Sequence, residues 1–138
     1  MESKVIFLDA NIILDIIGTN RPKHNEAKEL WKLAVLKNIK ILLSEDILTN
    51  IFYISKEKRK VLEFFKLIQH RWEVVPFGKD VIKKAIDLSL EKDLDLEDVL
   101  QCLCANENAC EVFITNDKKF YDCGIKIMNC EEFLNYTD

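Results

Sequence analysis

The sequence predicts an α/β fold, a three-layer α/β/α sandwich around a central parallel sheet of about five strands. Two observations lead to this prediction. Short apolar segments recur along the chain, and segments in which apolar residues have helical spacing lie between them. The apolar segments are too short and too continuously apolar for exposed antiparallel strands. We therefore interpret them as buried parallel strands joined by right-handed crossovers.

The expected strands, in chain order, are residues 4–8, 40–43, 72–75, 112–115 and 126–128. Between them, apolar residues repeat at intervals of three and four positions, as a helix with one buried face requires. The clearest examples are Leu30, Leu33 and Ala34, then Val61, Phe64, Phe65 and Ile68, then Val81, Ala85, Ile86 and Leu88. The chain has three glycines and two prolines. So few turn residues favour a compact, helix-rich fold.

The composition predicts one domain over residues 1–138, because 49% of the chain is hydrophobic and one continuous core can form. No segment approaches the roughly 20 apolar residues that span a bilayer. We therefore expect neither a membrane segment nor a signal peptide. The five cysteines are an odd number without paired CxxC spacing. This pattern favours reduced thiols in a cytoplasmic protein over a disulfide framework.

The formal net charge of -4 argues weakly against a passive nucleic-acid binder, which normally carries a basic surface. It does not exclude a nuclease. Clustered carboxylates that recruit divalent cations make a protein acidic and still present a positive centre to a phosphate group.

Two acids stand where strands of the predicted sheet end. Asp9 directly follows the first strand, and Asp117 follows the fourth strand after one residue. Ligands of open parallel sheets bind outside the carboxyl ends of the strands, so a functional site is expected there. Each acid also has a purely structural interpretation. Asp9 is a suitable cap for the helix that follows it, and Asn116 with Asp117 favours a turn.

Three acids lie within four residues at the start of the late helix, namely Asp95, Glu97 and Asp98. Helix capping and the positive end of the helix macrodipole account for one or two of them. At least one acid is therefore available for another task. Asp98 precedes the apolar face by one position and is expected to lean toward the sheet edge, whereas Glu97 is expected to face water.

Four short motifs occur in a fixed order along the chain. They are Phe7-Leu8-Asp9-Ala10-Asn11, Asp95-Leu96-Glu97-Asp98-Val99-Leu100, Ile114-Thr115-Asn116-Asp117-Lys118-Lys119-Phe120 and the closing Cys130-Glu131-Glu132-Phe133-Leu134. In these motifs the chain resembles the PIN-domain nucleases, which include the VapC-like toxins of bacterial and archaeal toxin–antitoxin pairs. The resemblance covers nearly the whole chain and implies a PIN-like fold.

By this resemblance, Asp9, Asp98 and Asp117 are the catalytic acids that bind the cofactor, Mg²⁺ or Mn²⁺. The supporting polar groups implied by the same resemblance are Asn11, Thr115 and Asp95. Hard divalent ions prefer oxygen ligands, which these residues supply. The resemblance also implies RNA as the substrate and an antitoxin protein as a partner.

One position departs from the family pattern. The family usually carries a Glu on the helix after the second strand, and this chain has Asn50 there. An amide oxygen can bind Mg²⁺ but lacks charge, so weaker metal binding or lower activity is expected. Asp46 lies one helical turn earlier and partly substitutes for the missing acid. If Asn50 faces the metal, its replacement by Glu is expected to tighten metal binding.

The leading hypothesis is a metal-dependent endoribonuclease that hydrolyses RNA phosphodiester bonds as the toxin of a toxin–antitoxin pair. The alternative is a catalytically weakened PIN-like module that binds RNA or a protein, and Asn50 is the feature that supports it. A third class, the haloacid-dehalogenase-type phosphotransfer enzymes, expects a second Asp two residues after Asp9. This chain has Asn11 at that position.

The segment of residues 47–68 is rich in aromatic and aliphatic side chains. Their number exceeds what one small core needs, so we expect part of this segment to form a homodimer interface.

Overall fold

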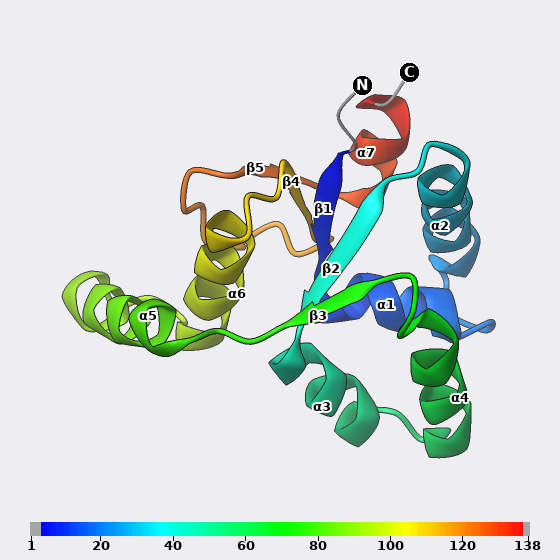
Figure 1. Ribbon diagram of the computed structural model, residues 1–138, viewed down its shortest axis with the longest axis horizontal. Coiled ribbons are helices and arrows are strands. Elements are labelled where there is room, and N and C mark those ends of the chain that lie inside the picture. Colours follow the sequence, from blue (N-terminus) through cyan, green and yellow to red (C-terminus); the bar gives the residue numbers. More distant parts are fainter. Residues whose placement is uncertain (1–3, 137–138) are drawn as a thin grey trace.

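A five-stranded parallel sheet forms the centre of the molecule, with strand order β3-β2-β1-β4-β5 (Figure 1). The computed structural model describes residues 4–136. The strands are β1 (Val5–Leu8), β2 (Lys40–Ser44), β3 (Glu73–Val75), β4 (Val112–Ile114) and β5 (Lys126–Met128). All four neighbouring pairs run parallel. The predicted sheet is therefore confirmed, with differences of one residue at several strand ends.

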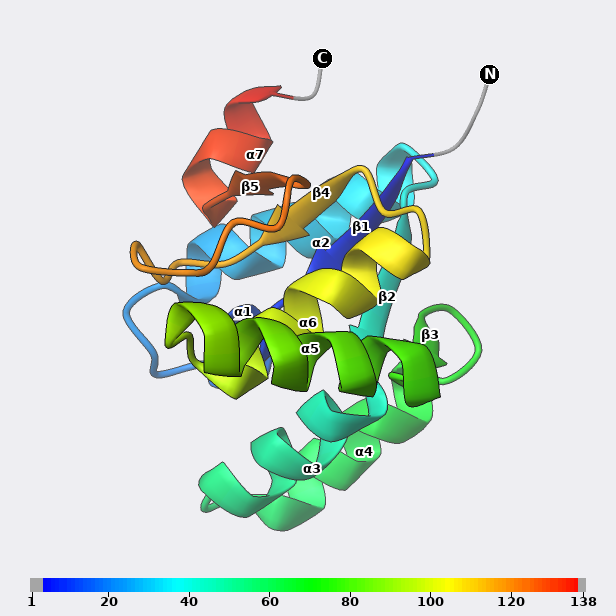
Figure 2. The same cartoon turned by 90° about the vertical axis from the view of Figure 1, so that its left-hand side faces the viewer.

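Helices lie on both faces of the sheet, which confirms the predicted three layers. In Figure 2, α5 and α6 lie in front of the sheet, and α1 and α2 lie behind it. The helices are α1 (Ala10–Ile17), α2 (His24–Leu36), α3 (Glu45–Ile54), α4 (Lys58–Ile68), α5 (Lys79–Lys92), α6 (Leu96–Glu107) and α7 (Cys130–Tyr136). None of the helices described is long and apolar enough to cross a membrane.

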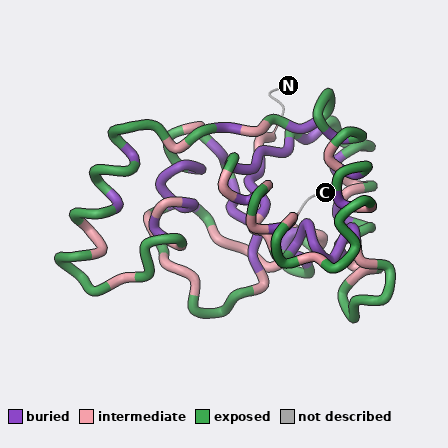
Figure 3. The backbone as a smooth tube through the Cα atoms, turned by 90° about the horizontal axis from the view of Figure 1, so that it is seen from below, coloured by how far each residue is buried: buried purple, intermediate pink, exposed green. Residues whose placement is uncertain are grey.

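The central strands are buried on both faces, which explains why their sequences do not alternate between apolar and polar residues. Phe7 of β1 and Phe113 of β4 are both fully buried, and their rings stack with centroids 5.2 Å apart. Figure 3 shows the buried part of the chain gathered along the sheet, with the exposed part on the outer turns of the helices. Burial of this kind contributes about 25 cal/mol per Å² of apolar surface.

A smaller apolar cluster holds α5 against α6, through Val81, Ala85, Val99 and Leu103. This contact matters for function because α6 begins with the acids of residues 95–98. The helix that presents these acids is therefore packed between the sheet and α5.

The expectation that all five cysteines are reduced thiols is wrong for two of them. Cys102 of α6 and Cys123 of the β4–β5 connection form a disulfide, with their Cα atoms 6.0 Å apart. These residues are 21 positions apart in the sequence, so the pairing depends on tertiary structure and leaves no local spacing signal. The other three, Cys104, Cys110 and Cys130, are buried free thiols.

Candidate active site

The carboxyl ends of β1 and β2 point to the end of the molecule where α1 and α3 begin and where α6 starts (Figure 1). Asp9 lies at this edge, between β1 and α1. Its backbone N–H donates to the carbonyl of Ile114 at 3.0 Å, which aligns the end of β1 with the end of β4. The sheet register therefore brings Asp9 next to the segment that follows β4.

The two oxygens of the Asp9 carboxylate have different partners. Oδ1 accepts a hydrogen bond from the backbone N–H of Ala10 at 2.8 Å, so Asp9 does cap α1. Oδ2 accepts a hydrogen bond from the hydroxyl of Thr115 at 2.7 Å. Asp9 therefore caps α1 with one oxygen and contacts the segment that follows β4 with the other.

Thr115 also connects Asp9 to Asp117. Its side chain is buried, and its Oγ1 accepts a hydrogen bond from the backbone N–H of Asp117 at 3.1 Å. The exposed Asp117 carboxylate accepts from the backbone N–H of Lys119 at 2.9 Å, which is the turn expected from the sequence. One hydroxyl thus positions two of the predicted acids.

At the start of α6, Asp95 caps the helix, and the side chain of Asp98 is not used for capping. Asp95 is the N-cap, and its Oδ1 accepts from the backbone N–H of Asp98 at 3.1 Å. This bond leaves the Asp98 side chain free to point away from the cap. Asp98 is half-buried, as expected for a residue that leans toward the sheet edge.

Electrostatics show that the predicted acids lie near one another. Burial, together with the charges of Asp95, Asp117, Asp9 and Glu97, raises the pKa of Asp98 to about 6. Burial also raises the pKa of Asp9. The hydrogen bonds from Thr115 and Ala10 oppose this shift, and the charge of Asp117 adds to it. Asp9, Asp98 and Asp117 therefore form one group of repelling carboxylates.

A second polar network, not predicted from the sequence, borders this group. The hydroxyl of Ser44 donates to Oε1 of Gln101 at 2.8 Å, and Nε2 of Gln101 donates to Oδ2 of Asp46 at 3.1 Å. Nδ2 of Asn50 donates to Oδ2 of Asp46 at 3.2 Å and to Oε1 of Glu97 at 2.9 Å. The network links α3, which follows β2, to the first turns of α6.

The structure refines the sequence expectations for Glu97 and Asn11. Glu97 is exposed, but its carboxylate is turned to Asn50 rather than to water alone, because the amide offers it a hydrogen bond. Asn11 is exposed on the first turn of α1, and no hydrogen bond described for residues 4–136 ties its side chain to the acids. The sequence did contain a sign that Gln101 has a polar partner. It is an amide inside an apolar helical segment, four residues after Glu97, and the structure buries it.

The donor set fits a hard divalent cation. Six carboxylates border this edge, and within residues 4–136 none of them forms a salt bridge: Asp9, Asp46, Asp95, Glu97, Asp98 and Asp117. As the side chains stand, no group of three His, Cys, Asp or Glu residues in the described chain has the geometry to hold an ion. A cation between these carboxylates would offset the repulsion that contributes to the raised pKa of Asp98.

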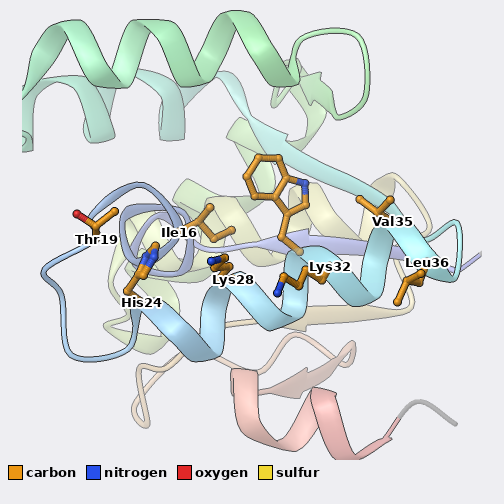
Figure 4. Close-up of a pocket in the computed structure, with 8 residues that line it drawn as sticks. Ile16, Thr19, His24, Lys28, Lys32, Val35 and Leu36 are labelled. Carbon is orange, nitrogen blue, oxygen red and sulfur yellow. The ribbon is translucent and has the colours of Figure 1, made fainter.

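A separate hollow lies away from these acids. It has a volume of about 680 Å³ and runs along α2 (Figure 4). Its walls include Ile16, Thr19, Trp31, Val35 and Leu36, and none of the predicted site residues lines it. The hollow therefore takes no part in positioning the acids.

Comparison with protein families decides how this arrangement is classified. The PIN domain model matches residues 6–126. The chain belongs to the PIN domain family. This PIN domain is 36% identical to a protein named Ribonuclease VapC1 from Aquifex aeolicus (strain VF5), over 96% of the chain and 95% of the relative.

Solved structures share the fold of this PIN domain. VapC20 of Mycobacterium tuberculosis, described as a sarcin-ricin loop cleaving toxin, superposes with a TM-score of 0.72 at 15% identity, over 87% of this chain and 95% of its own. VapBC2 of Rickettsia felis, bound to a DNA fragment from its promoter, gives 0.69 at 21% identity, over 91% and 98%. At these identities the comparison supports the predicted PIN-like fold.

Proposed function

We propose that this PIN domain is a metal-dependent ribonuclease whose Asp9, Asp98 and Asp117 bind Mg²⁺ or Mn²⁺ against a phosphate of RNA. The observation that carries the proposal is the group of unpaired carboxylates at the carboxyl edge of the sheet, with Asp9 and Asp117 joined through Thr115. The relative named a ribonuclease, at 36% identity, supports RNA as the substrate.

A bound divalent ion supplies positive charge that attracts the phosphodiester and lowers the pKa of a bound water. The residues of this chain prepare the place for it. Thr115 fixes one oxygen of Asp9 and the backbone of Asp117, so two ligands keep their orientation. Asp95 fixes the first turn of α6 and with it the position of Asp98. These side chains are therefore ordered when the protein folds, so substrate binding does not have to supply the free energy of ordering them.

Protons compete with the ion for these ligands. The raised pKa of Asp98, about 6, means that its carboxylate is partly protonated in mildly acidic solution. Metal binding and cleavage are therefore expected to increase with pH up to about 7. No histidine is needed as a base in this arrangement. His24 contacts the backbone carbonyl of Asp15 instead.

The proposal is tested by incubating the purified protein with a mixed RNA sample in the presence of Mg²⁺ or Mn²⁺. Asp9→Asn, Asp98→Asn and Asp117→Asn are each expected to reduce cleavage by about 100-fold or more, since loss of outer-shell partners alone reduces activity by about 10–100-fold. Asp87→Asn, an exposed acid of α5, is the matched control and should cleave like the parent. Cleavage that persists in EDTA, or in all three site variants, would contradict the proposal.

We further propose that the protein acts as the toxin of a toxin–antitoxin pair. Solved complexes with the same fold support this, including one described as a toxin–antitoxin complex from Klebsiella pneumoniae. Expression of the parent alone should arrest growth, and Asp9→Asn should not. If a small protein is encoded immediately upstream, its co-expression should relieve the arrest. Equal growth of parent and Asp9→Asn cultures at equal protein levels would count against a toxin.

The second candidate is a PIN-like module that binds RNA without cutting it. Asn50 supports this candidate because it supplies no charge at a position where the family usually has an acid. Gel-shift and cleavage measurements on the same RNA separate the two functions. A binding module retains RNA with Mn²⁺ present and leaves it intact, whereas the ribonuclease shortens it.

A further inference from the structure

The side chain of Asn50 contacts carboxylates from two different helices. Its side-chain nitrogen donates to two carboxylates, Asp46 at 3.2 Å and Glu97 at 2.9 Å. Asp46 lies one turn earlier on α3, but Glu97 belongs to α6 and is 47 positions away. The uncharged amide of Asn50 therefore holds a charged carboxylate of another helix beside it.

We propose that Glu97 supplies a fourth carboxylate to the metal centre in place of the acid that Asn50 lacks, and that Asn50 is the positioning residue that holds it. This inference rests on the proposed function, because it concerns a ligand of the same ion.

Both carboxylates that Asn50 contacts use one oxygen for their hydrogen bonds, and within the described chain the other oxygen of each has no protein partner. Oδ2 of Asp46 accepts from both Asn50 and Gln101, so this carboxylate is anchored between α3 and α6. Glu97 accepts one bond, at Oε1, and within the described chain its Oε2 has no protein partner. Glu97 thus has one oxygen for orientation and one for a ligand.

The location of Glu97 fits this role. It precedes Asp98 in the first turn of α6, which the Asp95 cap holds in place. The backbone of Glu97 is therefore held directly beside that of Asp98. Carboxylates crowd together without a cation here, and a fourth ligand charge would strengthen the attraction for a divalent ion.

An acid at position 50 without a further change would not reproduce the arrangement. Asn50→Glu removes the amide that two carboxylates share and adds a third negative charge beside them. The double variant Asn50→Glu/Glu97→Gln is different, because it keeps the number of charges and exchanges donor and acceptor across the same contact. The pair of positions can therefore be tested by a charge swap.

The experiment is calorimetric titration of Mn²⁺ into the metal-free protein, with far-UV circular dichroism to confirm folding. Glu97→Gln should weaken Mn²⁺ binding by about tenfold or more, the lower end of the range for disturbed metal sites. The double variant Asn50→Glu/Glu97→Gln should recover most of the parent's affinity. Glu107→Gln, at the exposed opposite end of the same helix, should bind Mn²⁺ like the parent.

Asn50→Ala gives a separate measure of positioning. It keeps the Glu97 charge but removes the hydrogen bond that orients it, so its loss of Mn²⁺ affinity should be smaller than that of Glu97→Gln. Parent-like affinity in Glu97→Gln would overturn the inference and leave the ribonuclease proposal standing. A double variant no tighter than Glu97→Gln would also overturn it. If the parent itself neither binds Mn²⁺ nor cleaves RNA, the proposed function fails, and the inference fails with it.

Discussion

The hydroxyl of Thr115 donates a 2.7 Å hydrogen bond to the carboxylate of Asp9, across 106 positions of sequence. Thr115→Val keeps the shape of the side chain and removes this bond. Loss of the partner of a buried polar group costs about 1–3 kcal/mol of stability. Asp9 and Asp117 also lose their common contact, so Mn²⁺ affinity should fall by about 10–100-fold. Calorimetry and urea unfolding measure the two effects.

Thr115→Ser is the matched control because it retains the hydroxyl. Its Mn²⁺ affinity should stay within a few fold of the parent, a difference in binding free energy of about 1 kcal/mol or less. If Thr115→Val binds Mn²⁺ as tightly as Thr115→Ser, the hydroxyl does not orient the acids.

The carboxylates predict a pH dependence of folding in the absence of metal. The pKa of Asp98 is about 6 in the folded protein, against an ordinary value of 3.8, so the folded state binds more protons between these values. Its contribution to stability is therefore greatest below about pH 4 and is lost as pH rises through about 6. Asp98→Asn should remove this part of the dependence and raise stability at pH 7 by up to about 1 kcal/mol, since the acid is only partly buried.

Urea unfolding of parent and Asp98→Asn in EDTA, at pH 5 and pH 7, measures this effect. With saturating Mn²⁺ the order should reverse, because the ion stabilises the ionised parent by an amount that grows with the logarithm of its affinity. An identical pH dependence for both proteins in EDTA would show that Asp98 does not experience the repulsion described.

The disulfide predicts a dependence of stability on reductant. Cys102 and Cys123 enclose a loop of about 20 residues, and a crosslink of that length stabilises a protein by about 3 kcal/mol through the unfolded state. Dithiothreitol should lower the unfolding midpoint of the parent accordingly. The double variant Cys102→Ser/Cys123→Ser should unfold at one midpoint with or without dithiothreitol. A parent midpoint insensitive to full reduction would contradict the prediction.

The homodimer expected from the sequence remains a prediction, and the structure exposes apolar side chains on the segment that the sequence analysis assigned to the interface. Four large apolar side chains of α3 and α4 are exposed, namely Tyr53, Ile54, Leu62 and Leu67. Sedimentation at tens of micromolar should show a dimer for the parent and a monomer for Ile54→Asp. Leu36→Asp, an exposed apolar position on α2, is the control and should remain dimeric. A monomeric parent under these conditions would argue against an interface of ordinary size.

The parts of the site that could be predicted from the sequence are those that depend on local order. Asp9 and Asp117 follow apolar strands directly, and parallel strands end at one edge, so their approach follows from topology. Asp95 has the spacing of a helix cap, and its bond to the backbone of Asp98 has that geometry. In each of these cases a few neighbouring residues decide the outcome.

The parts that were missed depend on which helices meet. The orientation of Glu97 is decided by Asn50, which belongs to a different helix. The disulfide of Cys102 depends in the same way on where the β4–β5 connection passes α6. Helical periodicity locates such side chains on a face, but it does not say what the face meets.

The strand order has a consequence for synthesis of the protein. β1 is paired on one side with β2 and on the other with β4, which begins more than 100 residues later. At about 5–20 residues per second, a ribosome needs about 5–20 s after Asp9 before it has added Thr115. Until then Asp9 has neither its hydroxyl partner nor Asp117 beside it. A nascent or prematurely terminated chain that lacks β4 therefore has an incomplete group of acids at this edge, because the contacts through Thr115 form only after that residue has been added.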